Sequence, residues 1–273
     1  MKFICGRYQL DLSPPHVMGI VNVTPDSFSD GGKYSSTELA VAHAIELVEQ
    51  GADILDIGGE STRPGATPVS LEDELQRVLP VIEQLAKRVD VPLSIDTYKP
   101  EVMRAAIAAG ADIVNDVRAL QEPHALEIVA ASNVGVCLMH MQGTPQTMQL
   151  EPQYEDVVAE VAGFLQSRLQ AAQAAGIAAE RITLDPGFGF GKRTVHNIAL
   201  LQQLPVLQAL GYPLLVGLSR KSVLGKITGE DVDSRLYASL AASVIATIKG
   251  AAIVRVHDVK ATAEALKVVA AVR

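Results

Sequence analysis

The side chains with the greatest chemical potential in this chain stand where short apolar runs end. They are carboxylates, amides, hydroxyls, imidazoles and cations, and in chain order they are Asn22, Asp56, Asp96, Asn115, Asp116, His140, Asp185, Ser219, Arg220, Lys221, Arg255 and His257. A single Asn, Asp or Ser in such a place is more often the cap of the following helix. Capping explains the whole set poorly, because a carboxylate at the end of a buried segment is costly to desolvate without a partner.

These side chains divide into two groups by charge. The acceptors and amides, which suit a polar heterocycle with several N–H donors, are Asp56, Asp96, Asn115 and Asp185. The cationic group, which suits a phosphate-like anion, lies nearer the C-terminus and consists of Arg220, Lys221, Arg255 and His257. The residues therefore predict a ligand that combines a polar ring with a phosphate group.

The elements that must position these groups are short β-rich runs, which alternate with longer segments of helical character. Eight strands are expected, near Val17 to Val23, Ile54 to Gly58, Leu93 to Thr97, Ile113 to Asp116, Val134 to Met141, Ile182 to Asp185, Leu214 to Ser219 and Ile253 to His257. An amphipathic helix is expected over Glu74 to Arg88, although Pro80 argues against its continuity. The alternating stretch from Lys2 to Leu12 predicts a small hairpin.

Three similar segments support a repeated unit of one strand and one helix. Each begins with a glycine, at Gly51, Gly110 and Gly250, where a helix would end before a buried strand. Eight such units with polar strand ends favour a closed (β/α)8 TIM barrel over an open doubly wound sheet. We expect one domain over residues 1–273 whose site lies at the C-terminal ends of the strands.

Composition excludes several classes of partner and location. The chain has 273 residues, of which 48% are hydrophobic, and a formal net charge of −8 without a basic run. Nucleic acid and an anionic membrane surface are therefore not expected partners. No apolar stretch is long enough for a signal sequence or a membrane span, so we expect a cytoplasmic location. Cys5 and Cys137 stand apart in apolar surroundings and are expected to be packing residues.

One glycine-rich motif resembles a phosphate-binding loop but lacks two of the residues that such a loop requires. In the segment Gly187 to Lys192, Pro186 stands where the loop needs its first glycine, and Arg193 replaces the Ser or Thr. The glycine spacing of a dinucleotide fold is also absent. We expect a tight turn that brings Phe188 or Phe190 over the barrel mouth.

Zinc binding and Schiff-base formation are two other chemistries that these residue types could support. The histidines show no zinc-ligand spacing, so packing or surface roles are expected for His16, His43, His124 and His196. Lys221 could form a Schiff base with a carbonyl substrate, but the adjacent Arg220 makes an anion clamp at least as good an explanation.

Two long loops rich in Gly, Pro, Ser and Thr follow the first two strands, at residues 24–32 and 60–66. Loops of this kind often close over a substrate. Phe28, Thr62 and Arg63 have no evident packing reason to stand there, whereas ordinary surface turns explain Ser27 and Ser29 as well.

At these residues the chain resembles the dihydropteroate synthases, which join a dihydropterin to 4-aminobenzoate and are the target of sulfonamide drugs. The resemblance covers nearly the whole chain. The motifs that carry it are MGIVNVTPDSFSDGG from Met18, DIGGESTRPG from Asp56, SIDT from Ser94, Asn115-Asp116, LMHM from Leu138, LDPGFGFGK from Leu184, GLSRKS from Gly217 and RVHDV from Arg255. Ala238 departs from the pattern, since many relatives have glycine there.

The resemblance implies a role for each group of residues. The pterin ring would be held by Asp56, Asp96, Asn115, Asp185 and Lys221, and the diphosphate by Asn22, Thr62, Arg63, Arg255 and His257, with Mg²⁺ at Asn22. The aminobenzoate would be surrounded by Phe28, Thr62, Arg63, Pro64, Phe190, Ser219, Arg220 and Lys221. The catalytic group would be Asp96, Asp185, Lys221, Arg255 and His257. Family members are generally homodimers.

The implied reaction breaks the C–O bond between the pterin methylene and diphosphate and forms a C–N bond to the arylamine. We predict a dissociative, SN1-like path, in which Arg255, His257 and Mg²⁺ neutralise the leaving group and the carboxylates stabilise positive charge in the pterin. An arylamine is already neutral at pH 7, so its attack needs no strong base. Three alternatives remain: a non-catalytic pterin-binding paralogue, a barrel that presents a methylated folate to a corrinoid protein, and an aldolase that uses Lys221.

Overall fold

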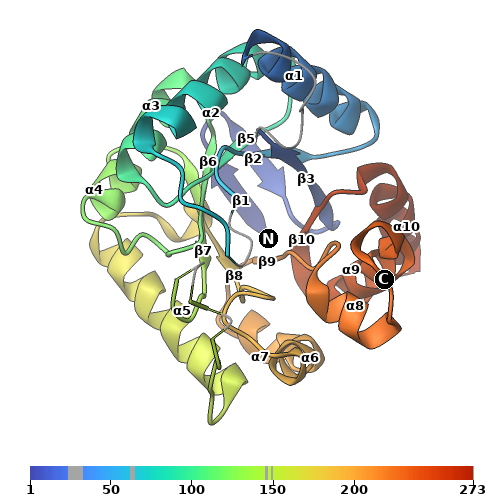
Figure 1. The fold of residues 1–273 in the computed structure, drawn as a ribbon. Coiled ribbons are helices and arrows are strands. Elements are labelled where there is room, and N and C mark those ends of the chain that lie inside the picture. Colours follow the sequence, from blue (N-terminus) through green and yellow to red (C-terminus); the bar gives the residue numbers. More distant parts are fainter. Residues whose placement is uncertain (24–32, 62–64, 145–146, 149, 273) are drawn as a thin grey trace.

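The computed structural model describes residues 1–23, 33–61, 65–144, 147–148 and 150–272. Its centre is a closed barrel of eight parallel strands in the order β10-β3-β4-β5-β6-β7-β8-β9 (Figure 1). The strands are β3 (His16–Asn22), β4 (Ile54–Gly58), β5 (Leu93–Asp96), β6 (Ile113–Asp116), β7 (Gly135–Met139), β8 (Ile182–Asp185), β9 (Leu214–Val216) and β10 (Ala251–Val256). The expectation of a TIM barrel is confirmed.

Helices surround the barrel and cover its outer face (Figure 1). They are α1 (Lys33–Glu49), α2 (Leu71–Leu85), α3 (Pro100–Ala109), α4 (Ala125–Ala130), α5 (Val157–Ala174), α6 (Thr194–Gln202), α7 (Leu204–Gln208), α8 (Ser222–Thr228), α9 (Leu236–Ile248) and α10 (Val259–Val272), with short 3-10 turns at Ala179–Arg181 and Val232–Ser234. Among the described helices, none combines the length and the apolarity needed to span a lipid bilayer.

Strand register brings the polar strand ends together. In the parallel pairing, Asn22 lies opposite Gly58, Gly58 lies opposite Asp96, and Asp96 lies opposite Asn115. Parallel strands all end at the same rim of the barrel, so residues far apart in the sequence become neighbours there. This register is the geometric basis of the site described below.

The observed elements differ from the expected ones mainly at their ends. β9 stops at Val216 rather than Ser219, because the chain turns, and the Lys221 N–H donates to the Leu218 carbonyl at 3.2 Å. β7 is shorter than expected at both ends. Helix α2 continues through Pro80, since the Ser70 hydroxyl caps its first turn and one apolar face is buried.

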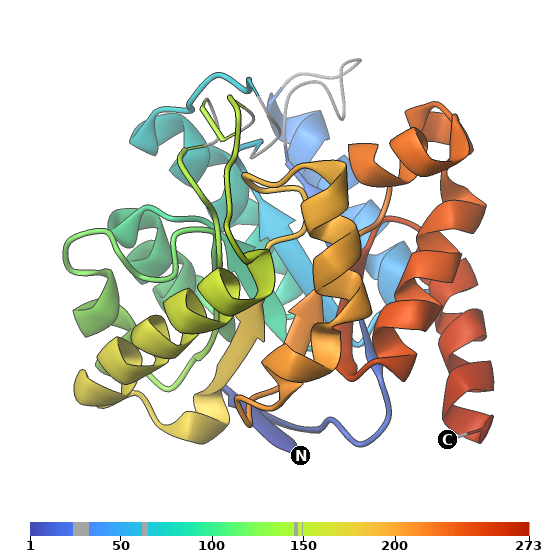
Figure 2. The same ribbon diagram turned by 90° about the horizontal axis from the view of Figure 1, so that it is seen from below.

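The N-terminal hairpin, β1 (Lys2–Cys5) with β2 (Tyr8–Asp11), covers the end of the barrel where the strands begin (Figure 2). Phe3, Cys5 and Leu12 are buried there against residues from the starts of the strands, among them Met18 and Ile113. Cys137 lies in the same cluster, and both cysteines are buried free thiols. The expectation that they are packing residues is confirmed.

One buried carboxylate ties this hairpin to the barrel. Asp112 accepts hydrogen bonds from Arg7 Nε at 3.1 Å and Nη2 at 3.2 Å, and from the Leu93 N–H at 3.1 Å. Arg7 is half exposed, whereas the Asp112 side chain is buried. Asp112 therefore joins the hairpin to two neighbouring strands at the end opposite the polar rim.

We expect Asp112→Ala to lower the free energy of unfolding by about 1–3 kcal/mol, because it leaves the buried Leu93 N–H without an acceptor. Urea unfolding measures this, with Asp90→Ala as a control that removes only an exposed contact to the Tyr8 hydroxyl. Equal stability of the two variants would contradict the role assigned to Asp112.

Candidate active site

The centre of the site is a guanidinium shared by two buried carboxylates. Arg255, from β10, donates through Nε to Asp56 Oδ2 at 2.5 Å and through Nη2 to Asp96 Oδ2 at 2.7 Å. Asn115 Nδ2 donates to the same Asp56 oxygen at 3.1 Å. The four side chains come from β4, β5, β6 and β10, so this group exists only in the closed barrel.

Burial and charge act on these groups in opposite directions. Burial raises the pKa of Asp96 to about 7, and Arg255 opposes that rise. Burial by itself would lower the pKa of Arg255, but Asp56 and Asp96 together raise it above its usual range. Arg255 thus stays charged, whereas Asp96 can change its protonation state near neutral pH.

Several buried polar atoms beside this ion pair lack a hydrogen-bond partner. Among the described side chains they are Asp56 Oδ1, Asp96 Oδ1 and Ser94 Oγ. Leaving a buried acceptor unsatisfied costs free energy, so such atoms in a folded protein call for an explanation. A ligand that supplies N–H donors would give these atoms the partners that they lack.

A second group lies on the neighbouring strand ends. Asp185, at the end of β8, accepts from the Gly187 N–H at 2.7 Å, and Lys221 donates through Nζ to the Phe188 carbonyl. Burial raises the pKa of Asp185, and the charge of Lys221 opposes this. Burial lowers the pKa of Lys221 to about 8. The Lys221 ammonium lies 4.6 Å from the centre of the Phe190 ring.

The glycine-rich segment forms the expected turn. Of its two aromatic residues, Phe190 faces Lys221, whereas the Phe188 side chain is fully buried. The expectation is therefore met by Phe190.

The cations of the last two strand ends have different partners. Ser219 Oγ lies 3.1 Å from His257 Nδ1 and accepts from the His257 N–H at 3.2 Å. Arg220 forms a two-point pair with Asp258, from Nη2 to Oδ1 at 2.6 Å and from Nε to Oδ2 at 3.0 Å. Because Asp258 engages this guanidinium, the part of Arg220 in binding a carboxylate stays a prediction.

Two residues at strand ends, Asp116 and His140, have hydrogen-bond partners outside the groups described above. Asp116 accepts from the N–H groups of Arg118 at 2.8 Å and Leu120 at 2.7 Å, so it orders the following turn. His140 follows β7 and contacts Lys192 instead, with 2.9 Å between its Nδ1 and the lysine Nζ. For these two, the simpler structural explanation holds.

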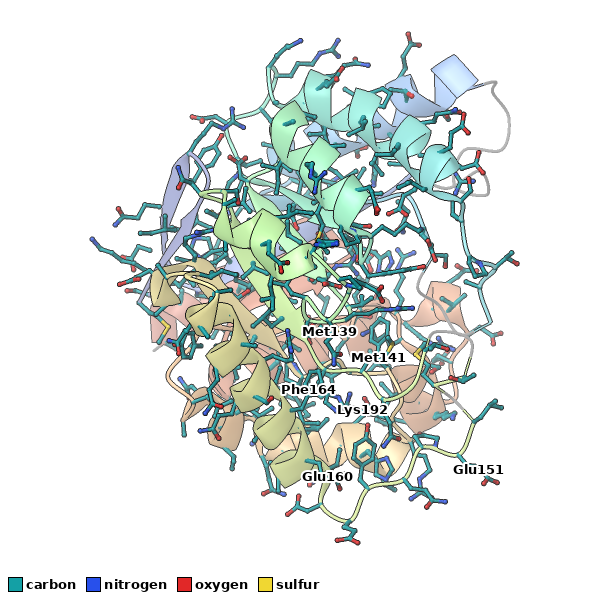
Figure 3. All side chains as sticks on the ribbon, turned by 90° about the vertical axis from the view of Figure 1, so that its left-hand side faces the viewer. Met139, Met141, Glu151, Glu160, Phe164 and Lys192 are labelled. Carbon is teal, nitrogen blue, oxygen red and sulfur yellow. The ribbon has the colours of Figure 1, made fainter. Side chains whose placement is uncertain are left out.

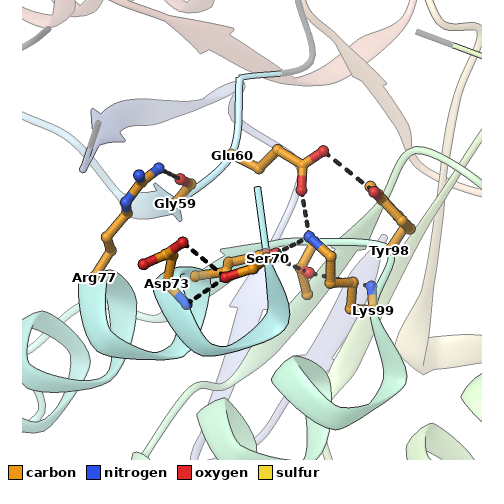
Figure 4. Close-up of polar contacts among 9 residues, drawn as sticks. Gly59, Glu60, Ser70, Asp73, Arg77, Tyr98 and Lys99 are labelled. Carbon is orange, nitrogen blue, oxygen red and sulfur yellow. Dashed lines mark hydrogen bonds and ion pairs between the residues drawn. The ribbon is translucent and has the colours of Figure 1, made fainter. Parts of the chain in front are cut away.

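Four expected site residues, Phe28, Thr62, Arg63 and Pro64, lie outside the described residues. The segment that precedes residues 62–64 is described, and it is fixed by a polar network (Figure 4). Lys99 Nζ pairs with both Glu60 and Glu74.

Further bonds of this network join the loop to its neighbours. The Tyr98 hydroxyl donates to Glu60 at 3.2 Å, and Arg77 Nη1 donates to the Gly59 carbonyl at 2.8 Å (Figure 4). Sequence reasoning missed this network. Its one sequence signal is an acidic residue, Glu74, on the apolar face of a helix.

The protein oxygens at the rim limit the way in which Mg²⁺ could bind there. Among residues 1–23, 33–61, 65–144, 147–148 and 150–272, no three His, Cys, Asp or Glu side chains are grouped so as to hold a metal ion. Mg²⁺ typically keeps several waters and takes its remaining ligands from one or two protein oxygens and from substrate phosphates. The single amide oxygen of Asn22, at the end of β3, fits an ion that arrives with a phosphate ligand.

The comparisons with known proteins agree with this geometry. The model of the pterin binding enzyme family matches residues 18–257. The dihydropteroate synthase of Escherichia coli strain K12 is 54% identical over 271 residues, which are 99% of this chain and 96% of the relative. This chain belongs to the dihydropteroate synthase family.

Solved structures of family members have the same fold. A Xanthomonas albilineans dihydropteroate synthase with 4-aminobenzoic acid superposes with a TM-score of 0.94 at 56% identity, over 99% of this chain and 97% of that one. A Yersinia pestis dihydropteroate synthase in a sulfonamide drug complex gives a TM-score of 0.95 at 50% identity, over 100% and 99%. The resemblance inferred from the motifs is confirmed at the level of the family.

We expect Asp96→Asn to stabilise the protein at pH 8 and to do so less at pH 5. The folded chain holds the pKa of Asp96 near 7, above its ordinary value. Between the two values the folded state binds more protons than the unfolded state, so stability falls as pH rises. Asparagine has no proton to lose and escapes that loss. Thermal unfolding at both pH values measures the effect, with the exposed Asp233→Asn as control, and a benefit that is larger at pH 5 would contradict it.

Proposed function

We propose that this protein is a transferase that condenses 6-hydroxymethyl-7,8-dihydropterin diphosphate with 4-aminobenzoate, giving 7,8-dihydropteroate and diphosphate in folate biosynthesis. The observation that carries the proposal is the pair of buried carboxylates, Asp56 and Asp96, each with one oxygen that lacks a hydrogen-bond partner. In a family of pterin binding enzymes, a ring edge rich in N–H groups is the ligand that satisfies such oxygens.

The ring pocket consists of the acceptors and the amide at the ends of β4, β5, β6 and β8. In this proposal the carboxylates of Asp56, Asp96 and Asp185 contact the ring directly, together with the Asn115 amide. Asp56 also fixes that amide through the 3.1 Å bond. Lys221 donates to a ring acceptor from the β9 side. A carboxylate and a cation on opposite sides of the pocket select a ring that has both donors and acceptors.

Ring binding also frees a charge for the leaving group. Arg255 forms ion pairs with both Asp56 and Asp96. When ring N–H groups bind these carboxylates, the guanidinium can turn toward the diphosphate, where His257 and Asn22 lie at the ends of the adjacent strands β10 and β3. Arg255 would thus act on the leaving group only in the protein that already holds its pterin.

The charge arrangement favours a dissociative path. Arg255 and His257 stabilise the negative charge that develops on the departing diphosphate, while Asp96 and Asp185 stabilise positive charge in the pterin ring. Mg²⁺, bound at Asn22 together with the diphosphate, would supply Lewis acidity to the leaving group. No residue is needed as a strong base, because the arylamine attacks in its neutral form.

The aminobenzoate would lie at the outer edge of this pocket. Phe190 offers a ring face, and Lys221 and Ser219 offer donors to the carboxylate. Phe28, Thr62, Arg63, Pro64 and Arg220 belong to the same pocket by family resemblance. Sulfonamides, as arylamines of similar shape, would compete for it. We place the reaction in the cytoplasm, in keeping with two buried cysteines that are both free thiols.

The first experiment measures diphosphate release and dihydropteroate formation in one tube with Mg²⁺, with and without 4-aminobenzoate. Equal amounts of both products are expected from the wild type. Asp185→Ala is expected to lose pterin binding and activity, because the carboxylate that faces the ring is gone, while the exposed control Glu264→Ala keeps both. Pterin binding by the wild type without product would favour a non-catalytic paralogue instead.

We further propose that the protein forms a homodimer through α6, α8 and α9. These helices pack side by side and carry exposed apolar side chains, namely Val195, Ile198, Ile227, Tyr237, Ile245 and Ile248. Tyr237 is 81% exposed, and large apolar side chains exposed on neighbouring helices are typical of association sites.

Ile248→Glu should convert the dimer to a monomer, because a carboxylate in an apolar interface loses its hydration. Sedimentation equilibrium measures the mass, and Val268→Glu is the matched control, since Val268 is also exposed but lies on α10. A wild-type protein that sediments as a monomer would contradict the proposal.

A further inference from the structure

Lys192 is a buried lysine that the proposed chemistry does not use. It follows the glycine turn after β8, and only 3% of the residue is exposed. Its Nζ lies 2.9 Å from His140 Nδ1, 2.9 Å from the Gly187 carbonyl oxygen, 3.0 Å from the Phe190 carbonyl oxygen and 3.2 Å from the His140 carbonyl oxygen. Figure 3 shows Lys192 beside the segment that carries Met139 and Met141. We call these four acceptors the Lys192 cage.

The cage suits an ammonium group. An ammonium has three N–H donors, and the acceptors around it are three carbonyl oxygens and one imidazole nitrogen. Burial lowers the pKa of Lys192 well below its ordinary value, and the charge of Lys221 lowers it further, whereas Asp185 raises it. The oxygen acceptors around Nζ also favour the charged form.

A neutral His140 can accept a hydrogen bond from this ammonium through Nδ1. Burial, together with the Lys192 charge, lowers the pKa of His140 to about 3. The imidazole packs edge-on against Phe164, with ring centres 4.9 Å apart, which fixes its orientation. In this arrangement the ring proton lies on Nε2.

The cage fastens the glycine turn to the end of β7. Gly187 and Gly191 have φ values of +67° and +61°, a conformation that favours glycine. A Cβ at Gly187 would lie 1.9 Å from the His140 carbonyl oxygen, and one at Gly191 would lie 2.5 Å from the Gln142 carbonyl oxygen. The turn is therefore packed backbone against backbone, and the Lys192 ammonium is the donor that joins its two sides.

The glycine turn positions the two charged side chains of the second group, Asp185 and Lys221. The Gly187 N–H donates to Asp185, and the Phe188 carbonyl accepts from Lys221. Phe188 lies between the two residues whose carbonyls the cage holds, Gly187 and Phe190. Movement of the turn would therefore shift Asp185 and Lys221 together.

We propose that Lys192 is a positioning residue for pterin recognition, acting through the glycine turn on Asp185 and Lys221. This inference rests on the proposed function, because it names the ring as the ligand whose contacts depend on the turn. Lys192 itself makes no contact with substrate. The diphosphate side of the pocket, formed by Asn22, Arg255 and His257 at the ends of β3 and β10, makes no hydrogen bond with Lys192 or with the glycine turn in the part of the chain that the structure describes.

The test compares two ligands in Lys192→Met, which keeps the apolar stem and removes the ammonium. Loss of the donor leaves buried carbonyls unsatisfied, so the Kd of the dihydropterin diphosphate is expected to rise about 10- to 100-fold. The Kd of inorganic diphosphate with Mg²⁺ is expected to stay within about twofold, because Asn22, Arg255 and His257 share no hydrogen-bond partner with Lys192. Lys267→Met, an exposed lysine on α10, is the matched control.

The possible outcomes distinguish a failure of the Lys192 proposal from a failure of the proposed function. Equal pterin binding by wild type and a folded Lys192→Met would overturn the role of Lys192 and leave the synthase assignment intact. Equal weakening of both ligands would also overturn it, since a general loss of structure would explain that result. A wild type that binds no dihydropterin would overturn the proposed function itself.

If Lys192→Met does not fold, a measurement on the wild type decides. A caged ammonium gives a slowly exchanging ¹H–¹⁵N signal at pH 7 with contacts to the His140 and Phe190 protons. A Lys192 amine that is neutral, or that exchanges with water as fast as the surface lysines do, would overturn the proposal.

Discussion

One guanidinium between two buried carboxylates is the interaction on which the rest of this site depends. Asp56 and Asp96 are almost completely buried, and Arg255 reaches both from β10, with β3 between that strand and β4. A buried carboxylate without a partner would protonate or destabilise the fold. Arg255 lets both remain in the barrel, yet it leaves one oxygen of each unsatisfied. The same contact therefore stabilises the buried carboxylates and leaves acceptors for a ligand with N–H donors.

The barrel is what makes this interaction possible. Eight parallel strands end at one rim, so side chains up to 199 positions apart along the chain come within hydrogen-bond distance. The hairpin at the other end shields the starts of the strands, and its tie through Asp112 is separate from the rim. The hairpin contacts lie at the end where the strands begin, and the candidate active-site residues lie at the end where they finish, as is usual for this architecture.

The group that contains Asp185 and Lys221 is held in place by a second buried cation, Lys192, whose surroundings differ from those of Arg255. Arg255 is balanced by carboxylates, whereas Lys192 is surrounded by carbonyl dipoles and a neutral imidazole. A charge held by dipoles imposes a backbone shape, since each carbonyl must point at the ammonium. This is a physical reason for a lysine to follow a turn of alternating glycines, and it gives that motif a role that does not require it to bind phosphate.

The sequence by itself determined the fold class, the family and the polar strand ends, because short apolar runs, glycine helix ends and family motifs are local signals. The strands Ile54–Gly58, Ile113–Asp116 and Ile182–Asp185 were predicted with the bounds that the structure has. Only the tertiary structure decided which polar residues face one another. Asp116 caps a turn, Arg220 pairs with Asp258, and Lys192 is the centre of a cage, although nothing in their local sequence distinguishes them from Asp96, Lys221 or Arg255. The physical reason is that barrel closure and register set these distances, and neither is encoded in any short segment of the chain.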